Sequence, residues 1–264
     1  MTLEHSIGII GAGGWGTALA YILAENGHSP LLWTKDKSTA DEINTTHTNS
    51  VFLPHIELAK EIKATTDVAS MNACSTIIIT VPTQFIREVL DTHGFDLNGK
   101  NIINGSKGIE RGTLYTVSSI LHDIKQCDAM HYAVLSGPSH AEEAAKKVPT
   151  TVMVASANPE LAQLVQSLFN NQYFRVYTST DTIGAEIGGS LKNVIAIAAG
   201  IIDGLGIGDN TKAALITRGL EEIARLGIAM GANPRTFAGL SGLGDLYVTC
   251  SSRHSRDRKS TRLN

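Results

Sequence analysis

The stretch Gly11-Ala12-Gly13-Gly14-Trp15-Gly16 follows a short apolar run, residues 7–10, and opens an apolar segment over residues 17–23. The run predicts a buried strand, and the segment predicts a helix. Strand, glycine turn and helix in this order match the G-x-G-x-x-G fingerprint of dinucleotide-binding sheets. Gly11 would allow the tight turn, Gly13 would let the backbone approach a pyrophosphate, and Gly16 would let the helix pack on the strand. A glycine turn without a cofactor is the alternative, and the flanking strand and helix favour the cofactor.

Length and composition narrow the class of protein. The chain has 264 residues, of which 42% are hydrophobic and 18% charged, and its net charge is -3. This length suffices for two domains with a sizeable core. No block of basic residues favours nucleic acid or an anionic membrane as a partner. We therefore expect a small-molecule substrate and no nucleic acid.

The cysteines, the first residues and the apolar runs of the chain indicate in which cellular compartment the protein resides. The three cysteines, at positions 74, 127 and 250, are scattered, and they form neither a disulfide framework nor a metal-binding spacing. Residues 1–5 lack the basic region of a signal peptide. The apolar run Val194 to Ile202 is too short to span a bilayer. We expect a cytoplasmic protein with no integral membrane segment and no metal site.

The first part of the chain alternates strand and helix patterns, which is typical of a parallel, doubly wound, Rossmann-like sheet. Predicted strands cover residues 7–10, 29–34, 62–65, 76–81, 101–104, 132–136, 150–155 and 174–177. Predicted helices cover residues 17–23, 37–44, 83–91, 113–125, 139–147 and 159–170, and beyond residue 181 only helices follow, at 183–199, 211–230 and 234–240. The prediction is an α/β fold with a dinucleotide-binding domain at 1–181 and an all-α domain at 182–264.

Ligands of such sheets lie outside the carboxyl ends of the strands, so the loops there are informative. Lys35 and Asp36 follow the second strand, where a carboxylate favours NAD and a cation favours NADP. The pair leaves both cofactors open, with a lean toward NADP. Pro82 shapes a loop that could pack on the cofactor or simply start a helix, and Lys107 between two glycines would reach into the cleft.

Ser136-Gly137-Pro138-Ser139 ends a later strand. Ser139 with Glu142 has the spacing of a capping box, which predicts a helix that begins at this serine. The N-terminus of that helix would then face the cleft, where it favours an anionic group.

Lys192 is the only charged residue between Glu186 and Asp203. A lysine in so apolar a helix either reaches water or serves a site, and burial beside another cation would lower its pKa toward that of a general base. A glycine-rich turn presents Asp245, and Thr249 lies one helical turn further on. The basic stretch from residue 253 contains Ser255 and Arg256, which could bind phosphate or form a solvated tail.

Together these motifs resemble the bacterial-type NAD(P)-dependent sn-glycerol-3-phosphate dehydrogenases. They come in the family's order and cover the chain to about residue 258. Besides the glycine turn, the motifs are Leu32-Trp33, Phe52-Leu53-Pro54, Ser106-Lys107-Gly108, Ser136-Gly137-Pro138-Ser139, Gly189 to Ala199 with Lys192-Asn193, Gly242-Leu243-Gly244-Asp245-Leu246, and Ser255-Arg256.

The resemblance implies a role for individual residues. The implied cofactor contacts are Gly11, Gly13, Gly14, Trp15, Gly16, Lys35, Lys107, Ala141 and Arg256. The implied substrate contacts are Lys107, Gly137, Ser139, Lys192, Asp245, Ser255, Arg256 and Asp257, the last three near the substrate phosphate. Lys192 is the implied proton acceptor, with Asn193, Asp245 and Thr249 around it. The implied reaction interconverts sn-glycerol 3-phosphate and dihydroxyacetone phosphate with NAD(P), which supplies a precursor of phospholipids.

Two features depart from the family. Asp257 stands where the family usually has asparagine, and a carboxylate there would repel a phosphate unless it points away. The last residues, 259–264, do not resemble the family's continuation. We therefore expect a C-terminally truncated member with an incomplete helical domain, and a homodimer stays open.

Two other functions compete with this one. A 3-hydroxy acid dehydrogenase also pairs such a sheet with helices and a catalytic lysine, but it needs a site for a carboxylate rather than a phosphate. A truncated protein that binds nucleotide without turnover is the alternative outside the enzymes. Cofactor binding without turnover would separate the last from the two enzymes, and an assay with dihydroxyacetone phosphate and each reduced cofactor is the most informative test of the first.

Overall fold

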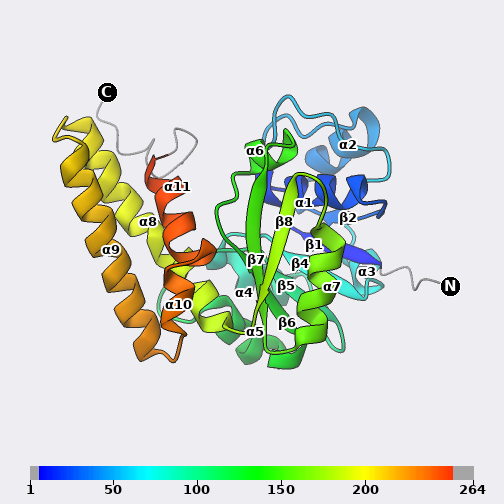
Figure 1. Cartoon of the computed structure of the whole chain (residues 1–264). Coiled ribbons are helices and arrows are strands. Elements are labelled where there is room, and N and C mark those ends of the chain that lie inside the picture. The colour runs from blue at the N-terminus through cyan, green and yellow to red at the C-terminus, as the bar shows by residue number, and fades with distance from the viewer. Residues whose placement is uncertain (1–5, 252–264) are drawn as a thin grey trace.

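The computed structural model describes residues 6–251, and its centre is one sheet of eight strands (Figure 1). The strands lie in the order β3-β2-β1-β4-β5-β6-β7-β8. All residues of β1 and β4, inside the sheet, are buried, because helices cover both of its faces. The bounds are β1 (Ile7–Ile10), β2 (Leu31–Trp33), β3 (Lys63–Thr65), β4 (Thr76–Ile79), β5 (Asn101–Asn104), β6 (Tyr132–Ser136), β7 (Thr150–Ser156) and β8 (Phe174–Ser179).

The predicted Rossmann-like sheet is confirmed, with one difference in strand direction. β1 to β6 are parallel, as expected. β7 runs antiparallel to β6, and β8 is parallel to β7. The prediction of an all-parallel sheet is therefore wrong for the last two strands. The segment between β6 and β7 contains only a five-residue helix, and it leads β7 back from the edge at which β6 ends.

Helices cover the two faces of the sheet, and alternate residues of β1 point to opposite faces. Ile9 lies in one core cluster with Leu19 and Phe169, whereas Ile10 lies in a second with Ile86. The helices and short helical turns of this unit are α1 (Gly14–Glu25), α2 (Lys37–Thr46), α3 (Val68–Asn72), η1 (Thr83–Phe85), α4 (Ile86–Thr92), α5 (Val117–Lys125), η2 (Ala129–His131), α6 (Ala141–Ala145) and α7 (Pro159–Phe169).

Beyond β8 the chain forms helices, which lie beside the sheet in Figure 1 (yellow to red). They enclose a separate core cluster that includes Ile187, Ile223 and Phe237. Their bounds are α8 (Thr182–Gly204), α9 (Asp209–Ala229), α10 (Pro234–Phe237), the π-helical turn η3 (Leu240–Gly244) and α11 (Asp245–Ser251). We call this part the helical unit and the part before it the sheet unit. The predicted all-α segment after the sheet is confirmed.

Asp181 fixes the start of the helical unit. Its carboxylate accepts a hydrogen bond from the Gly184 N–H at the start of α8 (3.0 Å). The same carboxylate accepts from the Asn233 N–H (3.0 Å) and the Thr236 hydroxyl (2.5 Å) at α10. One side chain therefore caps α8 and holds the start of α10 against it.

α8 is long and apolar enough to cross a membrane by length and composition alone. Half of its most apolar window is buried inside the molecule. The buried residues of α8 include the charged Glu186 and Lys192, which is what the core helix of a folded unit with a polar site would show.

Several predicted helix ends are wrong because tertiary contacts override local pattern. The helix predicted over 113–125 begins only at Val117, since Thr113 donates to Glu110 and Leu114 is left-handed (φ 60°). The predicted capping box is also wrong. α6 begins at Ala141, and Ser139 donates to the Gly137 carbonyl (3.0 Å) instead of capping the helix.

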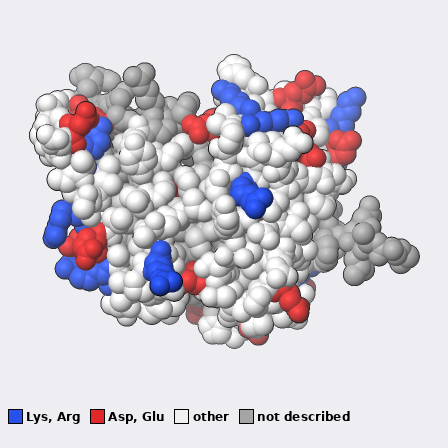
Figure 2. All heavy atoms as spheres, viewed as in Figure 1, with Lys and Arg blue, Asp and Glu red and all other residues white. Residues whose placement is uncertain are grey.

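Charged side chains are dispersed over the visible surface. Figure 2 shows one face, on which Lys and Arg lie in small groups beside Asp and Glu, with wide uncharged areas between them. No broad area of a single charge forms on that face.

Candidate active site

The glycine turn between β1 and α1 has the geometry that the fingerprint requires. Gly11 has a φ of 113°, which favours glycine. A Cβ on Gly16 would lie 2.0 Å from the Gly11 carbonyl oxygen, so α1 packs against the turn only because this residue has none. A Cβ on Gly13 would meet nothing within 4 Å. Gly13 therefore keeps open the space in front of the N-terminus of α1.

That space is part of a pocket of about 400 Å³ at the carboxyl ends of β1, β2 and β4. It is lined by Gly11, Gly13, Gly14, Trp15, Trp33, Thr34, Lys35, Phe52, Thr80, Val81, Pro82, Phe85, Glu88, Val89, Thr92 and His93. The predicted turn residues and Lys35 therefore meet in one pocket. Gly16 packs beneath the turn instead of lining it.

The pocket fits a dinucleotide. Gly13 is the N-cap of α1 and has no side chain to occupy the free N–H groups there, so these groups and the helix dipole can hold phosphates. The exposed Lys35 supplies a cation further along the wall. When a nicotinamide cofactor is bound here, it supplies or accepts a hydride.

Lys35 and Asp36 have separate roles in this structure. The Asp36 carboxylate accepts hydrogen bonds from the Ser38 N–H (3.0 Å) and the Thr39 hydroxyl (3.0 Å), which caps α2. These bonds, that from Thr39 first, lower the pKa of Asp36. Only Lys35 of the pair lines the pocket.

Phe52 and Phe85 are two lining residues to which the sequence analysis assigned no role. Both are about half exposed, 47% and 53%, at the mouth of the pocket. Phe52 belongs to the Phe52-Leu53-Pro54 motif, which could have indicated it, and Phe85 lies three residues after Pro82. Pro82, which the sequence left undecided, also lines the pocket.

The second part of the site is a cluster of two lysines around one carboxylate. Asp245, which is fully buried, accepts a hydrogen bond from Lys192 Nζ on Oδ1 (2.6 Å) and from Lys107 Nζ on Oδ2 (2.6 Å). Lys192 comes from α8, and Lys107 follows β5 of the sheet unit. The sequence predicted both lysines and the aspartate, and the structure brings them together where the two units meet.

Thr249 completes the surroundings of Lys192. Its hydroxyl donates to the Asp245 carbonyl (2.6 Å), one turn back on α11, and accepts from Lys192 Nζ (2.7 Å). Lys107 also donates to the Gly137 carbonyl (3.0 Å). An ammonium group has three N–H donors, so among the residues that the structure describes each lysine keeps one for a ligand.

Burial lowers the pKa of Lys107 to about 8, with a smaller lowering contribution from neighbouring Lys192 and an opposing contribution from Asp245. The expected lowering at Lys192 stays a prediction.

Neighbouring backbone holds Lys107 in place. Asn104 Oδ1 accepts from the Ser106 N–H (2.8 Å), and the Ser106 hydroxyl donates to the Val81 carbonyl (2.6 Å). The loop that carries Lys107 is thereby tied to the end of β4 and to the wall of the cofactor pocket.

The other residues predicted for the site differ in whether they contact this cluster. Gly137 contacts it directly, and Ser139 is bonded to the same Gly137 carbonyl. Ala141 packs with Trp15 beside the glycine turn. Asn193 is half-buried on α8, and none of the hydrogen bonds described for residues 6–251 joins its side chain to the cluster. Ser255, Arg256 and Asp257 lie outside the described residues.

Comparison with known proteins decides the family. Residues 6–162 match the N-terminal domain of NAD-dependent glycerol-3-phosphate dehydrogenases, and residues 181–263 match the C-terminal domain. The chain belongs to this family. The predicted resemblance is confirmed, and the 3-hydroxy acid dehydrogenase alternative is wrong.

Individual relatives agree with the family match. The chain is 54% identical to glycerol-3-phosphate dehydrogenase [NAD(P)+] of Lysinibacillus sphaericus over 252 residues, which is 94% of this chain and 75% of the relative. It is 50% identical to that of Enterococcus faecalis, covering 99% of this chain and 78% of the relative.

A solved structure agrees as well. The crystal structure of glycerol-3-phosphate dehydrogenase from Coxiella burnetii matches with a TM-score of 0.89 and 39% identity, over 97% of this chain and 78% of that one. Both units of the present fold therefore belong to the glycerol-3-phosphate dehydrogenase architecture.

Proposed function

We propose that Lys192 exchanges the proton in the reaction of this dehydrogenase, the interconversion of sn-glycerol 3-phosphate and dihydroxyacetone phosphate with NAD or NADP. The observation that supports it most is that one buried carboxylate, Asp245, is bonded to both Lys192 and Lys107, which come from two different units. A general acid or base must be held within reach of the proton it moves, and Asp245 with Thr249 holds the Lys192 amine in one place.

In the oxidation direction, Lys192 as a neutral amine takes the proton of the C2 hydroxyl. In the reduction direction, its ammonium returns a proton to the C2 oxygen and polarises the carbonyl beforehand. Asp245 orients the amine, and Thr249 keeps it there because its own hydrogen is already donated to the Asp245 carbonyl. Lys107, with its remaining N–H, binds the substrate together with Gly137 and Ser139.

The same proposal assigns the residues outside the cluster. Ser255 and Arg256 bind the substrate phosphate, with Asp257 beside them. Asn193 supports Lys192. Gly11, Gly13, Gly14, Trp15, Lys35 and Ala141 hold the cofactor, and Gly16 shapes the turn. Lys35 makes NADP the better cofactor, because Asp36 is committed to its helix and offers no carboxylate to the ribose.

We also infer the domain boundary, the cellular compartment and the metabolic use of the product. The boundary between the cofactor domain (1–181) and the substrate domain (182–264) falls where Asp181 caps α8. Three scattered cysteines with neither a disulfide framework nor a metal-binding spacing fit a reducing, cytoplasmic compartment. The product, glycerol 3-phosphate, feeds phospholipid synthesis.

Replacement of Lys192 by alanine tests the proton role. The loss of general acid–base help should lower kcat by about 10²–10⁴-fold, while the dissociation constant of the cofactor stays the same because the cofactor pocket lies in the sheet unit. Lys212→Ala is the matched control, since Lys212 forms an ion pair with Asp203 within the helical unit, away from Asp245. Its kcat should match that of the unmodified protein.

A Lys192→Ala variant that keeps more than about a tenth of the turnover would refute the assignment, because that loss is below the range of acid–base catalysis. Cofactor binding by the unmodified chain without turnover of dihydroxyacetone phosphate would instead support a nucleotide-binding protein that lacks activity.

A further inference from the structure

A second buried carboxylate, Glu186, lies on α8 and takes no part in the chemistry proposed above. Its residue is 5% exposed. The carboxylate accepts from the Ser118 N–H (2.9 Å) and the Ser118 hydroxyl (2.6 Å) at the start of α5. It also accepts from the Tyr132 hydroxyl on β6 (2.6 Å). All three donors belong to the sheet unit, so Glu186 fastens α8 to α5 and β6.

The backbone of Glu186 makes a second connection to the sheet unit. Its carbonyl accepts from the Ser190 hydroxyl (2.6 Å), and Ser190 Oγ accepts from the Gly108 N–H (3.0 Å). Gly108 follows Lys107 directly. One turn of α8 is therefore joined to the very loop that carries the second lysine of the site.

These contacts surround the region in which the two lysines meet. Lys192 lies six residues after Glu186 on α8, a rise of about 9 Å. A shift of α8 against the sheet unit would move Lys192 relative to Lys107, although both are bonded to the same Asp245. The position of Glu186 thus controls the geometry of the catalytic cluster from a distance.

We propose that Glu186, held by Ser118 and Tyr132, is a positioning residue that sets α8 against the sheet unit and thereby aligns Lys192 with the substrate held by Lys107. This inference rests on the proposed proton role of Lys192. Glu186 acts through the position of the helix and does not touch substrate or cofactor.

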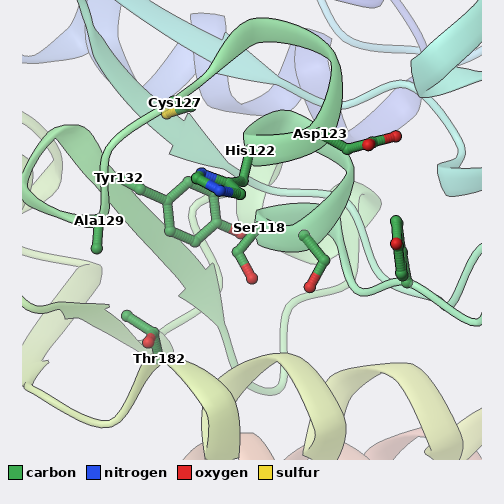
Figure 3. Close-up of a pocket in the computed structure, with 9 residues that line it drawn as sticks. Ser118, His122, Asp123, Cys127, Ala129, Tyr132 and Thr182 are labelled. Carbon is green, nitrogen blue, oxygen red and sulfur yellow. The ribbon is translucent and has the colours of Figure 1, made fainter.

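An open pocket of about 480 Å³, which shares no lining residue with the cofactor pocket, reaches this contact. Figure 3 shows Ser118 and Tyr132 in its wall between α5 and the start of α8, with His122, Asp123 and Cys127 around them. Burial and the Glu186 carboxylate raise the pKa of Tyr132, so it remains a donor at neutral pH. If the contact loosens, water from this pocket can enter behind the Lys107 loop.

Water entry would have a measurable effect on Lys107. The groups that face its ammonium are Asp245 on α11, Lys192 on α8 and the Gly137 carbonyl. Burial is the main reason for its lowered pKa of about 8. Hydration should therefore raise that pKa toward the value of an exposed lysine.

The test compares two neighbouring serines. Ser118→Ala removes a hydrogen bond to Glu186, whereas Ser119→Ala removes a hydroxyl that contacts Thr116, as Ser118 also does, but not Glu186. We expect Ser118→Ala to lower kcat about tenfold, as small misplacements near a reacting centre do, with the KM for the cofactor unchanged. Ser119→Ala should behave as the unmodified protein does.

The pKa of Lys107 is the second readout, and it does not depend on turnover. It can be followed by NMR of ¹³C-methylated lysines, with Lys107→Arg to assign the signal. In Ser118→Ala we expect it to rise by about half a pH unit or more because burial is relieved, and in Ser119→Ala to stay the same. Glu186→Gln, which replaces an acceptor oxygen by an amide donor, should reproduce both effects and serves if Ser118→Ala folds poorly.

Three outcomes would overturn the inference. In the first, Ser118→Ala and Ser119→Ala both keep the kcat and the Lys107 pKa of the unmodified protein. In the second, both variants lose activity equally. Ser118→Ala could also raise the KM for the cofactor by the factor by which it lowers kcat, which would indicate general damage. If the proposed proton role of Lys192 is wrong, Lys192→Ala will retain its turnover, and this result is distinct from the three outcomes above.

Discussion

Lys35 and Asp36 illustrate what neighbouring residues can and cannot indicate about cofactor choice. In sequence they are a cation and an anion at the position that distinguishes NADP from NAD, so both cofactors stayed open. The structure separates them, because the Asp36 carboxylate caps α2 and Lys35 lines the cofactor pocket. The N-cap position stabilises the Asp36 carboxylate without any cofactor, which leaves Lys35 as the member of the pair that lines the pocket.

Lys35→Ala should therefore weaken NADPH more than NADH. The loss of a charge-assisted contact to the 2′-phosphate is worth roughly 1–3 kcal/mol, or about five- to 150-fold in affinity. Dissociation constants of both reduced cofactors, measured by fluorescence titration, check this. Lys37→Ala is the control, since Lys37 is exposed and paired with Asp41 outside the pocket. Equal weakening of both cofactors in Lys35→Ala would rule out the phosphate contact.

At the scale of single residues, the sequence indicated most of the cluster around Asp245. Lys192 was conspicuous as a lone charge in an apolar helix, and Thr249 lies one helical turn after Asp245, as the spacing suggests. The shared use of Asp245 by two lysines was not predictable, because the partners lie 138 and 53 residues away in sequence. Glu186 was missed for the same reason, since its donors lie 68 and 54 residues away.

Among the elements, β1, β5 and β6 were the best predicted, because both ends of each strand agree with the prediction, whereas α1 begins three residues before and ends two residues after the predicted 17–23. Elements with conflicting signals were predicted less well. The glycine-rich turn just before Asp245 was predicted, but its π-helical form, η3, was not. A Cβ on Gly188 of α8 would lie 2.4 Å from the Ser241 carbonyl oxygen of η3, so contact between two segments, rather than local pattern alone, shapes this turn.

The glycine turn gives a paired prediction that separates a cofactor site from a plain turn. Gly13→Ala should leave the free energy of unfolding within about 0.5 kcal/mol, because its Cβ meets nothing within 4 Å. It should nevertheless weaken the cofactor, since the added methyl group occupies the space before α1. Gly16→Ala should destabilise the fold, because its Cβ would overlap the Gly11 carbonyl oxygen.

Urea unfolding and cofactor titration of the two variants provide the measurements. Gly27→Ala is a control for backbone strain alone, since Gly27 has a positive φ of 83° far from the pocket and its Cβ would also meet nothing. It should lose stability but bind the cofactor normally. Unchanged cofactor affinity in Gly13→Ala would contradict the proposed phosphate approach at this turn.

Over the whole molecule, the chain places its polar groups at the junction of two separate apolar cores. The helical unit has its own cluster around Ile187 and Phe237, and the sheet unit has one on each face. Asp245, Lys107 and Glu186 lie where the units meet, and each is bonded across the junction. The cluster of Lys107, Lys192 and Asp245 is therefore also part of what joins the units, so the groups proposed for catalysis contribute to folding as well.

Because a titratable lysine of this cluster lies at the junction of the two units, the cluster predicts how the free energy of unfolding depends on pH. Lys107 has a pKa of about 8 in the folded protein and 10.5 as its ordinary value. Between these values the unfolded chain binds the extra proton, so this lysine makes the free energy of unfolding rise with pH, by up to about 1.4 kcal/mol per pH unit. Below pH 8 the folded protein bears the full cost of the buried charge, and above pH 10.5 that cost is gone.

Other groups titrate in the same range with the opposite sign. Burial raises the pKa of the Cys127 thiol to about 11 and also raises that of Cys74, so the folded protein keeps these protons longer and they lower stability as pH rises. The contribution of Lys107 must therefore be isolated as a difference between two proteins.

Urea unfolding from pH 7.5 to 10.5, on the unmodified chain and on Lys107→Met, isolates it. The methionine keeps the length of the side chain without the charge. We expect the stability of the unmodified chain, minus that of Lys107→Met, to rise across this window and to level off above it. Lys212→Met is the control, because Lys212 forms its ion pair with Asp203 within the helical unit, away from Asp245, Cys74 and Cys127. A difference that stays flat or falls with pH would mean that the buried lysine keeps its proton through its contact with Asp245, and that the carboxylate outweighs burial in the cluster.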